Sequence, residues 1–166
     1  TDLKIGGDGI IVKIDETKLG KRKYNRGHRV EGVWVVGGIE RTMEKTVFIV
    51  AVQNRSAVTL TSIIQNHVHP GSILYTDLWR GYNTISNDDN YQYETVNHSL
   101  SFVNPDNGVH TNTIEGFWNG LKLNIKPRNR VANGMEEHLF ETIWRKINYT
   151  HLWNSFISAL KDAYYD

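Results

Sequence analysis

Three apolar segments rich in β-branched residues stand in the first third of the chain. They cover residues 9–15, 33–39 and 46–52, and their apolar residues follow one another without regular alternation. Near-continuous apolar runs of this length are typical of strands that are buried on both faces of a sheet. Because short connections join the three segments, we expect neighbouring strands to run antiparallel.

The period of the pattern changes after Ser56, and apolar residues then recur at helical spacing until Pro70. Serine is a favourable N-cap residue, and proline ends helices, so one helix is predicted between them. Residues 72–77 predict a fourth strand and residues 91–96 a fifth. Since a helix connects the third strand to the fourth, we expect the fourth to lie parallel to the first through a right-handed crossover.

Helical spacing returns in the last third of the chain. One helix is predicted over residues 111–126, and two more follow from Met135 onward. The last two carry apolar stripes, which predict core-facing surfaces rather than cofactor contacts. The stripes consist of Leu139, Phe140, Ile143, Trp144 and Ile147, then Leu152, Trp153, Phe156, Ile157 and Leu160. The whole pattern predicts one mixed α/β domain over residues 1–166, with residues 131–166 as its C-terminal helical part.

Composition excludes several classes of function. The chain has 166 residues, a length that suits one domain. It contains no cysteine. The absence of cysteine excludes a disulfide scaffold, a cysteine-based zinc site and a thiol nucleophile. No apolar run approaches the roughly 20 residues that a membrane helix needs, so no membrane partner is expected.

Charge is nearly balanced overall but is distributed unevenly. The net charge is +1, from 19 Lys and Arg against 18 Asp and Glu. Two basic clusters stand out, namely Lys18, Lys21, Arg22, Lys23, Arg26, His28 and Arg29, and Lys122, Lys126, Arg128 and Arg130. Such clusters can bind a polyanion, although a solvated hairpin and a helix end would have the same composition.

Two predicted strands end in an aspartate, Asp15 and Asp77. If these strands are parallel neighbours, both carboxylates emerge at the edge of the sheet where open α/β sheets bind ligands. Either aspartate alone could instead cap a turn or pair with a basic side chain. A third acid, Glu115, lies on the polar face of the helix predicted over residues 111–126, two turns before Lys122.

Together the three carboxylates would form an all-oxygen site, which suits Mg²⁺ or Mn²⁺ rather than zinc. Two such ions could activate a water or a 3′-hydroxyl and stabilise the leaving oxygen of a phosphodiester. Lys122 and the basic clusters would then hold the phosphates.

Three segments in this order resemble the catalytic blocks of Merlin-type transposases and of the related bacterial insertion-sequence transposases. They cover residues 12–32, 75–82 and 109–122. The resemblance implies a ribonuclease H-like fold, a mixed sheet flanked by helices. It also implies a DDE triad that binds two Mg²⁺ or Mn²⁺ ions, mapped residue by residue onto Asp15, Asp77 and Glu115. The 37 residues between Asp77 and Glu115 are near the family's short spacing.

The resemblance also suggests accessory residues. Lys122 matches the family's basic residue two turns after the acid. Some bacterial relatives use asparagine as the third ligand, which makes Asn112 the weaker candidate for that role. His98 and His110 fall at family-like positions where either could approach the metal or a phosphate, although a hydrogen-bonded loop histidine is the more common finding.

The function implied is that of the catalytic core of a cut-and-paste DNA transposase. It would cleave and join strands of double-stranded DNA, at transposon ends and target, as a homo-oligomer. The predicted DNA contacts are Lys21, Arg22, Lys23, Arg26, Arg29, Lys122, Lys126 and Arg128. A metal-dependent nuclease of the same fold and a host-adopted, non-enzymatic DNA-binding protein stay open as alternatives. A transposase of this kind is expected in the nucleus if the source is a eukaryote, or in the cytoplasm if it is a bacterium.

Overall fold

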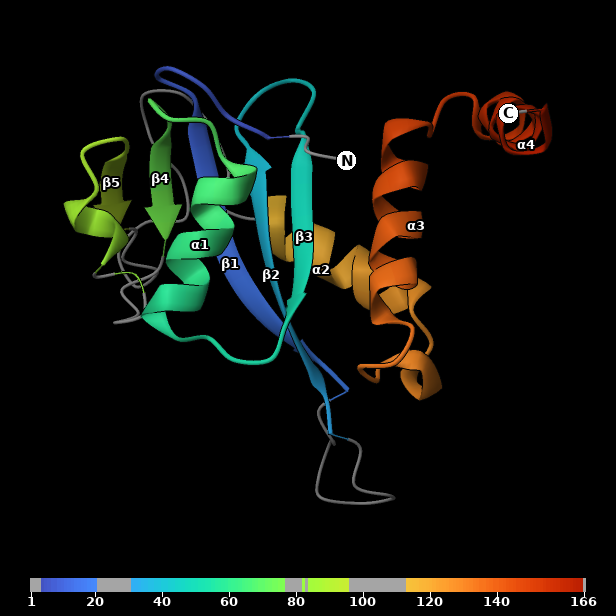
Figure 1. Cartoon of the computed structure of the whole chain (residues 1–166), viewed down its shortest axis with the longest axis horizontal. Coiled ribbons are helices and arrows are strands. Elements are labelled where there is room, and N and C mark those ends of the chain that lie inside the picture. Colours follow the sequence, from blue (N-terminus) through green and yellow to red (C-terminus); the bar gives the residue numbers. More distant parts are fainter. Residues whose placement is uncertain (1–3, 21–30, 77–81, 83, 96–112, 166) are drawn as a thin grey trace.

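A five-stranded sheet forms the centre of the molecule, with helices on both faces (Figure 1). The computed structural model describes residues 4–20, 31–76, 82, 84–95 and 113–165. The strands are β1 (Ile11–Leu19), β2 (Val33–Glu40), β3 (Val47–Val52), β4 (Ile73–Thr76) and β5 (Gln92–Thr95). They lie in the order β3-β2-β1-β4-β5.

The pairing of the strands follows the prediction. β1, β2 and β3 are antiparallel neighbours, and β4 lies parallel to β1 on its other side. In that parallel pair Ile11 is opposite Ile73 and Lys13 is opposite Tyr75. β5 runs parallel to β4 and forms the edge of the sheet.

Helix α1 (Ala57–His67) connects β3 to β4 and covers one face of the sheet (Figure 1). Its N-cap is Ser56, whose Oγ accepts a hydrogen bond from the backbone N–H of Thr59 at 3.2 Å. The helix ends before Pro70, as predicted. Its buried residues join a cluster with β1 and β4, formed in part by Val12, Ile14, Leu60, Ile64 and Leu74.

Helices α2 (Thr113–Asn124) and α3 (Met135–Ile147) cover the opposite face. A short 3₁₀ helix, η3 (Pro127–Asn129), lies between them, and another, η2 (Ile85–Asn87), precedes β5. The second cluster is formed in part by Leu19, Val35, Ile49, Ile114, Trp118, Leu121 and Leu139. The sheet is therefore buried on both faces, which explains why its strands read as continuous apolar runs.

One boundary differs from the expectation that the first strand ends at Asp15. β1 continues to Leu19, because its pairing with β2 extends from Asp15 opposite Gly37 to Leu19 opposite Val33. Thr17 and Leu19 are buried, so the alternation continues beyond the acid. Asp15 is therefore a mid-strand residue.

The prediction that the last helix faces the core is wrong. α4 (Leu152–Tyr165) extends away from the sheet (Figure 1), and none of its described side chains is buried. Trp153 is 70% exposed. On α3, Phe140 and Ile147 are also exposed, because only the side of α3 with Met135 and Leu139 packs on the sheet. Among the described residues, no helix is long and apolar enough to cross a membrane.

This difference in burial predicts a difference in stability. Leu139→Ala should lower the free energy of unfolding by about 2–5 kcal/mol, because the substitution leaves a cavity in a buried cluster. Trp153→Ala should change it by less than about 0.5 kcal/mol, because the ring is already in contact with water. Urea unfolding followed by circular dichroism measures both. A large loss in Trp153→Ala would contradict the exposed position of α4.

Candidate active site

Asp15 lies on the face of the sheet that α2 covers. Its Oδ2 accepts a hydrogen bond from Nε1 of Trp118 at 2.9 Å. Trp118 belongs to the buried cluster on this face and is 4% exposed. The bond therefore joins the middle of β1 to the middle of α2.

Glu115 lies in the first turn of α2, three residues before Trp118, and its side chain is exposed. Residues three apart are neighbours on a helix surface. The structure thus places the helix that carries Glu115 against the strand that carries Asp15. The N-terminal turn also favours a negative charge, because the helix dipole is positive there.

Asp77 lies outside the described residues, as do Asn112, His98 and His110. The strand before Asp77 is described, however, and β4 ends at Thr76. Lys13 is opposite Tyr75 in the parallel pair. In the sequence, Asp15 is two residues after Lys13, and Asp77 is two residues after Tyr75.

A buried tyrosine, Tyr82, is joined to β1 by a hydrogen bond. Tyr82 is 1% exposed, and its hydroxyl donates a hydrogen bond to Oε1 of Glu16 at 2.9 Å. Glu16 is the residue after Asp15, and Tyr82 is five residues after Asp77. This contact therefore fixes Tyr82 against β1 beside the position of Asp15.

Tyr75 and Lys13 are paired neighbours on the strands that lead to the site. Burial, and then the neighbouring Glu94 carboxylate, raise the pKa of the Tyr75 hydroxyl above its ordinary value. The Arg41 guanidinium carbon lies 5.4 Å from the centre of the Tyr75 ring. Burial and Glu94 therefore favour the protonated hydroxyl, and the positive charge of Arg41 opposes them.

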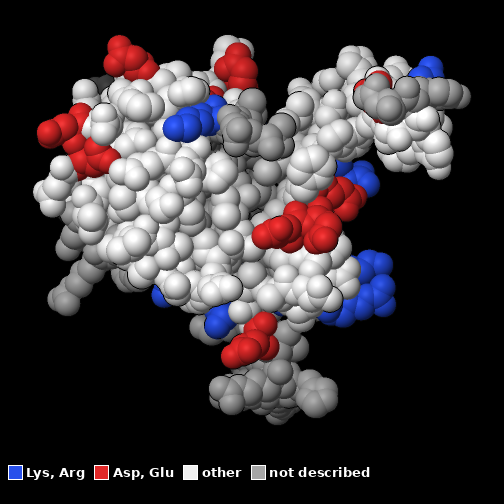
Figure 2. All heavy atoms as spheres, in the orientation of Figure 1, with Lys and Arg blue, Asp and Glu red and all other residues white. Residues whose placement is uncertain are grey.

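The predicted basic contacts are described only in part. Lys122 is half-buried on α2, whereas Lys126 and Arg128 are exposed around η3. Figure 2 shows basic side chains gathered at the lower right, where η3 lies in Figure 1. The five DNA contacts predicted from the first cluster lie outside the described residues, namely Lys21, Arg22, Lys23, Arg26 and Arg29.

Arg130, from the same basic cluster, has a structural role. Its Nε donates to the carbonyl oxygen of Ile125 at 3.0 Å, and its Nη2 donates to the carbonyl oxygen of Lys122. These carbonyls belong to the last turn of α2 and the residue after it, where helix carbonyls lack partners within the helix. Arg130 thus stabilises the end of the helix that carries Glu115.

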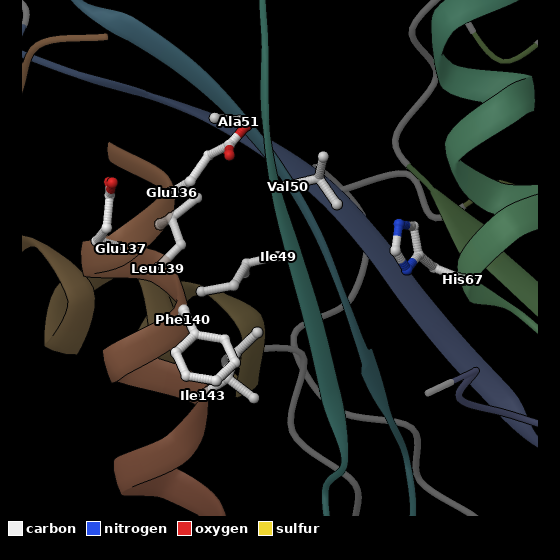
Figure 3. Close-up of a pocket in the computed structure, with 9 residues that line it drawn as sticks. All are labelled: Ile49, Val50, Ala51, His67, Glu136, Glu137, Leu139, Phe140 and Ile143. Carbon is white, nitrogen blue, oxygen red and sulfur yellow. The ribbon is translucent and has the colours of Figure 1, made fainter. Parts of the chain in front are cut away.

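A hollow of about 570 Å³ lies along β3, lined mainly by residues of β3 and α3 (Figure 3). Most of its lining is apolar, with Ile49, Leu139 and Phe140 facing the space and Glu136 at one end. His67 also lines it and stacks on Phe48, with 5.2 Å between the ring centres. Neither Asp15 nor Glu115 lines this hollow, so it is distinct from the carboxylate site.

The described acids of the predicted triad have the chemistry of ligands for a hard divalent cation. Among the described residues, no three His, Cys, Asp or Glu side chains form a group that could hold a metal ion. The two described carboxylates of the predicted triad supply oxygen donors of the kind that Mg²⁺ prefers. The indole that binds Asp15 is a neutral donor, so this bond leaves the carboxylate its negative charge. Asp15 and Glu115 therefore fit such an ion.

With this geometry in place, the class of fold is clear. The structure is similar to the catalytic core domain of BIV integrase, with a TM-score of 0.55, 14% sequence identity and 81% of each chain covered. At this identity the similarity concerns the fold, which is ribonuclease H-like, as predicted.

The chain belongs to the family of the ISXO2-like transposase domain, whose family model matches residues 4–132. It is also 34% identical over 104 residues to an uncharacterized transposase-like protein of Haemophilus influenzae. That match covers 62% of this chain and 82% of the relative. The predicted relationship to the insertion-sequence transposases is confirmed.

Trp118 is a neighbour of Asp15 that the sequence pattern did not single out. Helical projection places it at the border of the apolar face, and an aromatic residue there reads as core. Two signals were available: Trp118 follows Glu115 by one turn, and a glycine pair, Gly37-Gly38, interrupts the second apolar strand. A glycine inside a strand often marks a close approach by another group.

The Tyr82 contact generates a prediction about stability near the site. Tyr82→Phe should lower the free energy of unfolding by about 1.5–3 kcal/mol, because it removes a hydrogen bond to a carboxylate. Tyr91→Phe is the matched control. Its hydroxyl donates to the neutral carbonyl of Val68 at 3.1 Å, so the loss should be about 0.5–1.5 kcal/mol. Equal losses in urea unfolding would show that the hydrogen bond to the Glu16 carboxylate stabilises the fold no more than the bond to the neutral carbonyl of Val68.

Proposed function

We propose that this chain is the catalytic domain of a cut-and-paste DNA transposase, which cleaves and joins DNA strands by metal-assisted phosphoryl transfer. The observation that carries the proposal is the bond between Trp118 and Asp15, which holds the helix bearing Glu115 on the strand bearing Asp15. The family and the ribonuclease H-like fold support the same chemistry.

Asp77 is the proposed third ligand. The parallel pairing of Lys13 with Tyr75 supports this assignment, since each aspartate follows two residues later on its own chain segment. Asp15, Asp77 and Glu115 would hold two Mg²⁺ or Mn²⁺ ions. Such ions lower the pKa of a bound water or hydroxyl and stabilise a leaving oxygen.

The basic residues would hold the substrate. Double-stranded DNA is the proposed partner, and the exposed Lys126 and Arg128 would contact its phosphates together with Lys122. These residues follow Glu115 along the chain, Lys122 on α2 and the other two around η3. Phosphate contacts position the duplex but carry little sequence information. We further propose that the chain acts as a homo-oligomer on paired DNA ends.

The catalytic assignment predicts the loss of cleavage without loss of binding. Asp15→Asn and Glu115→Gln should each lower the rate of strand cleavage in Mg²⁺ by at least about 100-fold, because even the outer partners of metal ligands contribute 10–100-fold. Affinity for DNA should stay within a factor of about three, because no basic contact is removed. Asp162→Asn, on the exposed end of α4, is the control for the same chemical change.

Labelled duplexes with a free 3′-hydroxyl separate the alternatives in one assay. Cleavage followed by joining to a second duplex supports the transposase. Cleavage that ends in hydrolysis supports a nuclease of the same fold. DNA binding without either reaction in Mg²⁺ and Mn²⁺ supports a non-enzymatic DNA-binding protein. Full activity in Asp15→Asn would overturn the site assignment.

The basic surface around η3 predicts a change in salt dependence. Each lost phosphate contact should flatten the slope of log K against log salt by about 0.9, so the double variant Lys126→Ala, Arg128→Ala should lose about 1.8. Fluorescence anisotropy between 50 and 200 mM salt, with unrelated duplexes, measures the slope; Lys161→Ala on α4 is the control. The same titration tests Lys21, Arg22 and Lys23. An unchanged slope means that the substituted residues do not contact DNA.

A further inference from the structure

The indole of Trp118 is a fixed donor. The ring is buried in the cluster between α2 and the sheet, and it contacts Phe117 at a tilt of 51° with 5.6 Å between ring centres. Its Nε1 lies 2.9 Å from Oδ2 of Asp15. A ring held by packing on a helix can place an N–H group at one position, which a flexible side chain cannot do.

Gly37 makes room for this ring. It lies opposite Asp15 in the β1–β2 pair. A Cβ atom at Gly37 would stand 2.5 Å from Cη2 of Trp118, closer than carbon atoms approach in proteins. Gly37 is not among the residues with positive φ, so its backbone conformation does not require glycine. Glycine is required here because the indole of Trp118 occupies the space that a side chain would take.

The donor suits a carboxylate that must bind a cation. A lysine or arginine partner would also fix Asp15, but it would repel the incoming ion by its own charge. The neutral indole orients the carboxylate and adds no positive charge of its own. In metal sites, hydrogen-bond partners that orient a ligand commonly change metal affinity by 10–100-fold.

We propose that Trp118 is a positioning residue that, in the space left by Gly37, turns the Asp15 carboxylate toward a divalent cation. The inference rests on the proposed function, because it needs Asp15 to be a metal ligand. It assigns to an apparent core aromatic residue a role in metal binding. It also explains why glycine interrupts the second apolar strand at position 37.

The test is Mn²⁺ binding to the whole chain without DNA, by isothermal titration calorimetry. Trp118→Phe keeps an aromatic ring and removes the N–H, and it should weaken Mn²⁺ binding by about 10–100-fold. The isostere β-(3-benzothienyl)alanine at position 118 replaces N–H by sulfur at nearly constant shape, and it should weaken binding equally. Trp144→Phe, on a half-buried ring of α3, is the control and should bind like the wild type.

A structural role for the ring would give a different result. Circular dichroism establishes the folded fraction of each variant. If the affinity of the folded isostere variant equals that of the wild type, or falls only with the folded fraction, the positioning role is overturned. High Mg²⁺ should restore strand cleavage in Trp118→Phe but not in Asp15→Asn, because only the former keeps the ligand.

Gly37→Ala supplies an independent arm. It should weaken Mn²⁺ binding in the wild type, because the added methyl group displaces the indole, and should add little in Trp118→Phe, where the N–H is already gone. Additive effects would contradict the inference. The two proposals fail separately: if Asp15→Asn binds Mn²⁺ like the wild type, the metal site itself is wrong. If only Asp15→Asn loses binding and Trp118→Phe keeps it, the positioning role alone is wrong.

Discussion

The hydrogen bond between Trp118 and Asp15 joins positions that are 103 residues apart, and the arrangement of the site depends on it. α2 could slide or turn on an apolar sheet, since the hydrophobic effect has no direction. A buried N–H that must find an acceptor removes that freedom, because leaving it unpaired costs about 1–3 kcal/mol. Packing places α2 on the sheet, and the bond adds one directional contact that fixes α2, which carries Glu115, to β1.

The two faces of the sheet pack against different elements. The cluster under α1 contains Val12 and Ile14 of β1, Leu74 of β4 and the buried Tyr82, and it packs β4 and Tyr82 against β1. The cluster under α2 and α3 holds the helix that carries Glu115. The proposed site lies where the two meet, at β1, whose alternating side chains enter both clusters. This arrangement places the helix that carries Glu115 on the strand that carries Asp15, although the two are far apart in the sequence.

Asp15 shows which features of β1 follow from the sequence pattern and which do not. The apolar run before it predicted the strand, and the parallel neighbour was predicted from the helical crossover. The run appeared to end at Asp15 because a charged residue interrupts a buried strand. β1 continues because β2 pairs with it to Leu19, and because an indole donor satisfies the carboxylate inside the packed face. For α4 the pattern predicted the core, but amphipathic spacing shows only that one face is apolar, not that anything covers it.

The sequence by itself determined the strands and helices, the antiparallel and parallel pairing, the buried face of α2 and the acids expected at the site. These follow from spacing along the chain, because periodicity records which side of a helix or strand is apolar. Only the tertiary structure decided that Trp118 meets Asp15, that Gly37 gives the ring its space, and that Arg130 binds the end of α2. Those contacts depend on how α2 lies across β1 and β2. That placement is set by packing between distant segments, which no local spacing encodes.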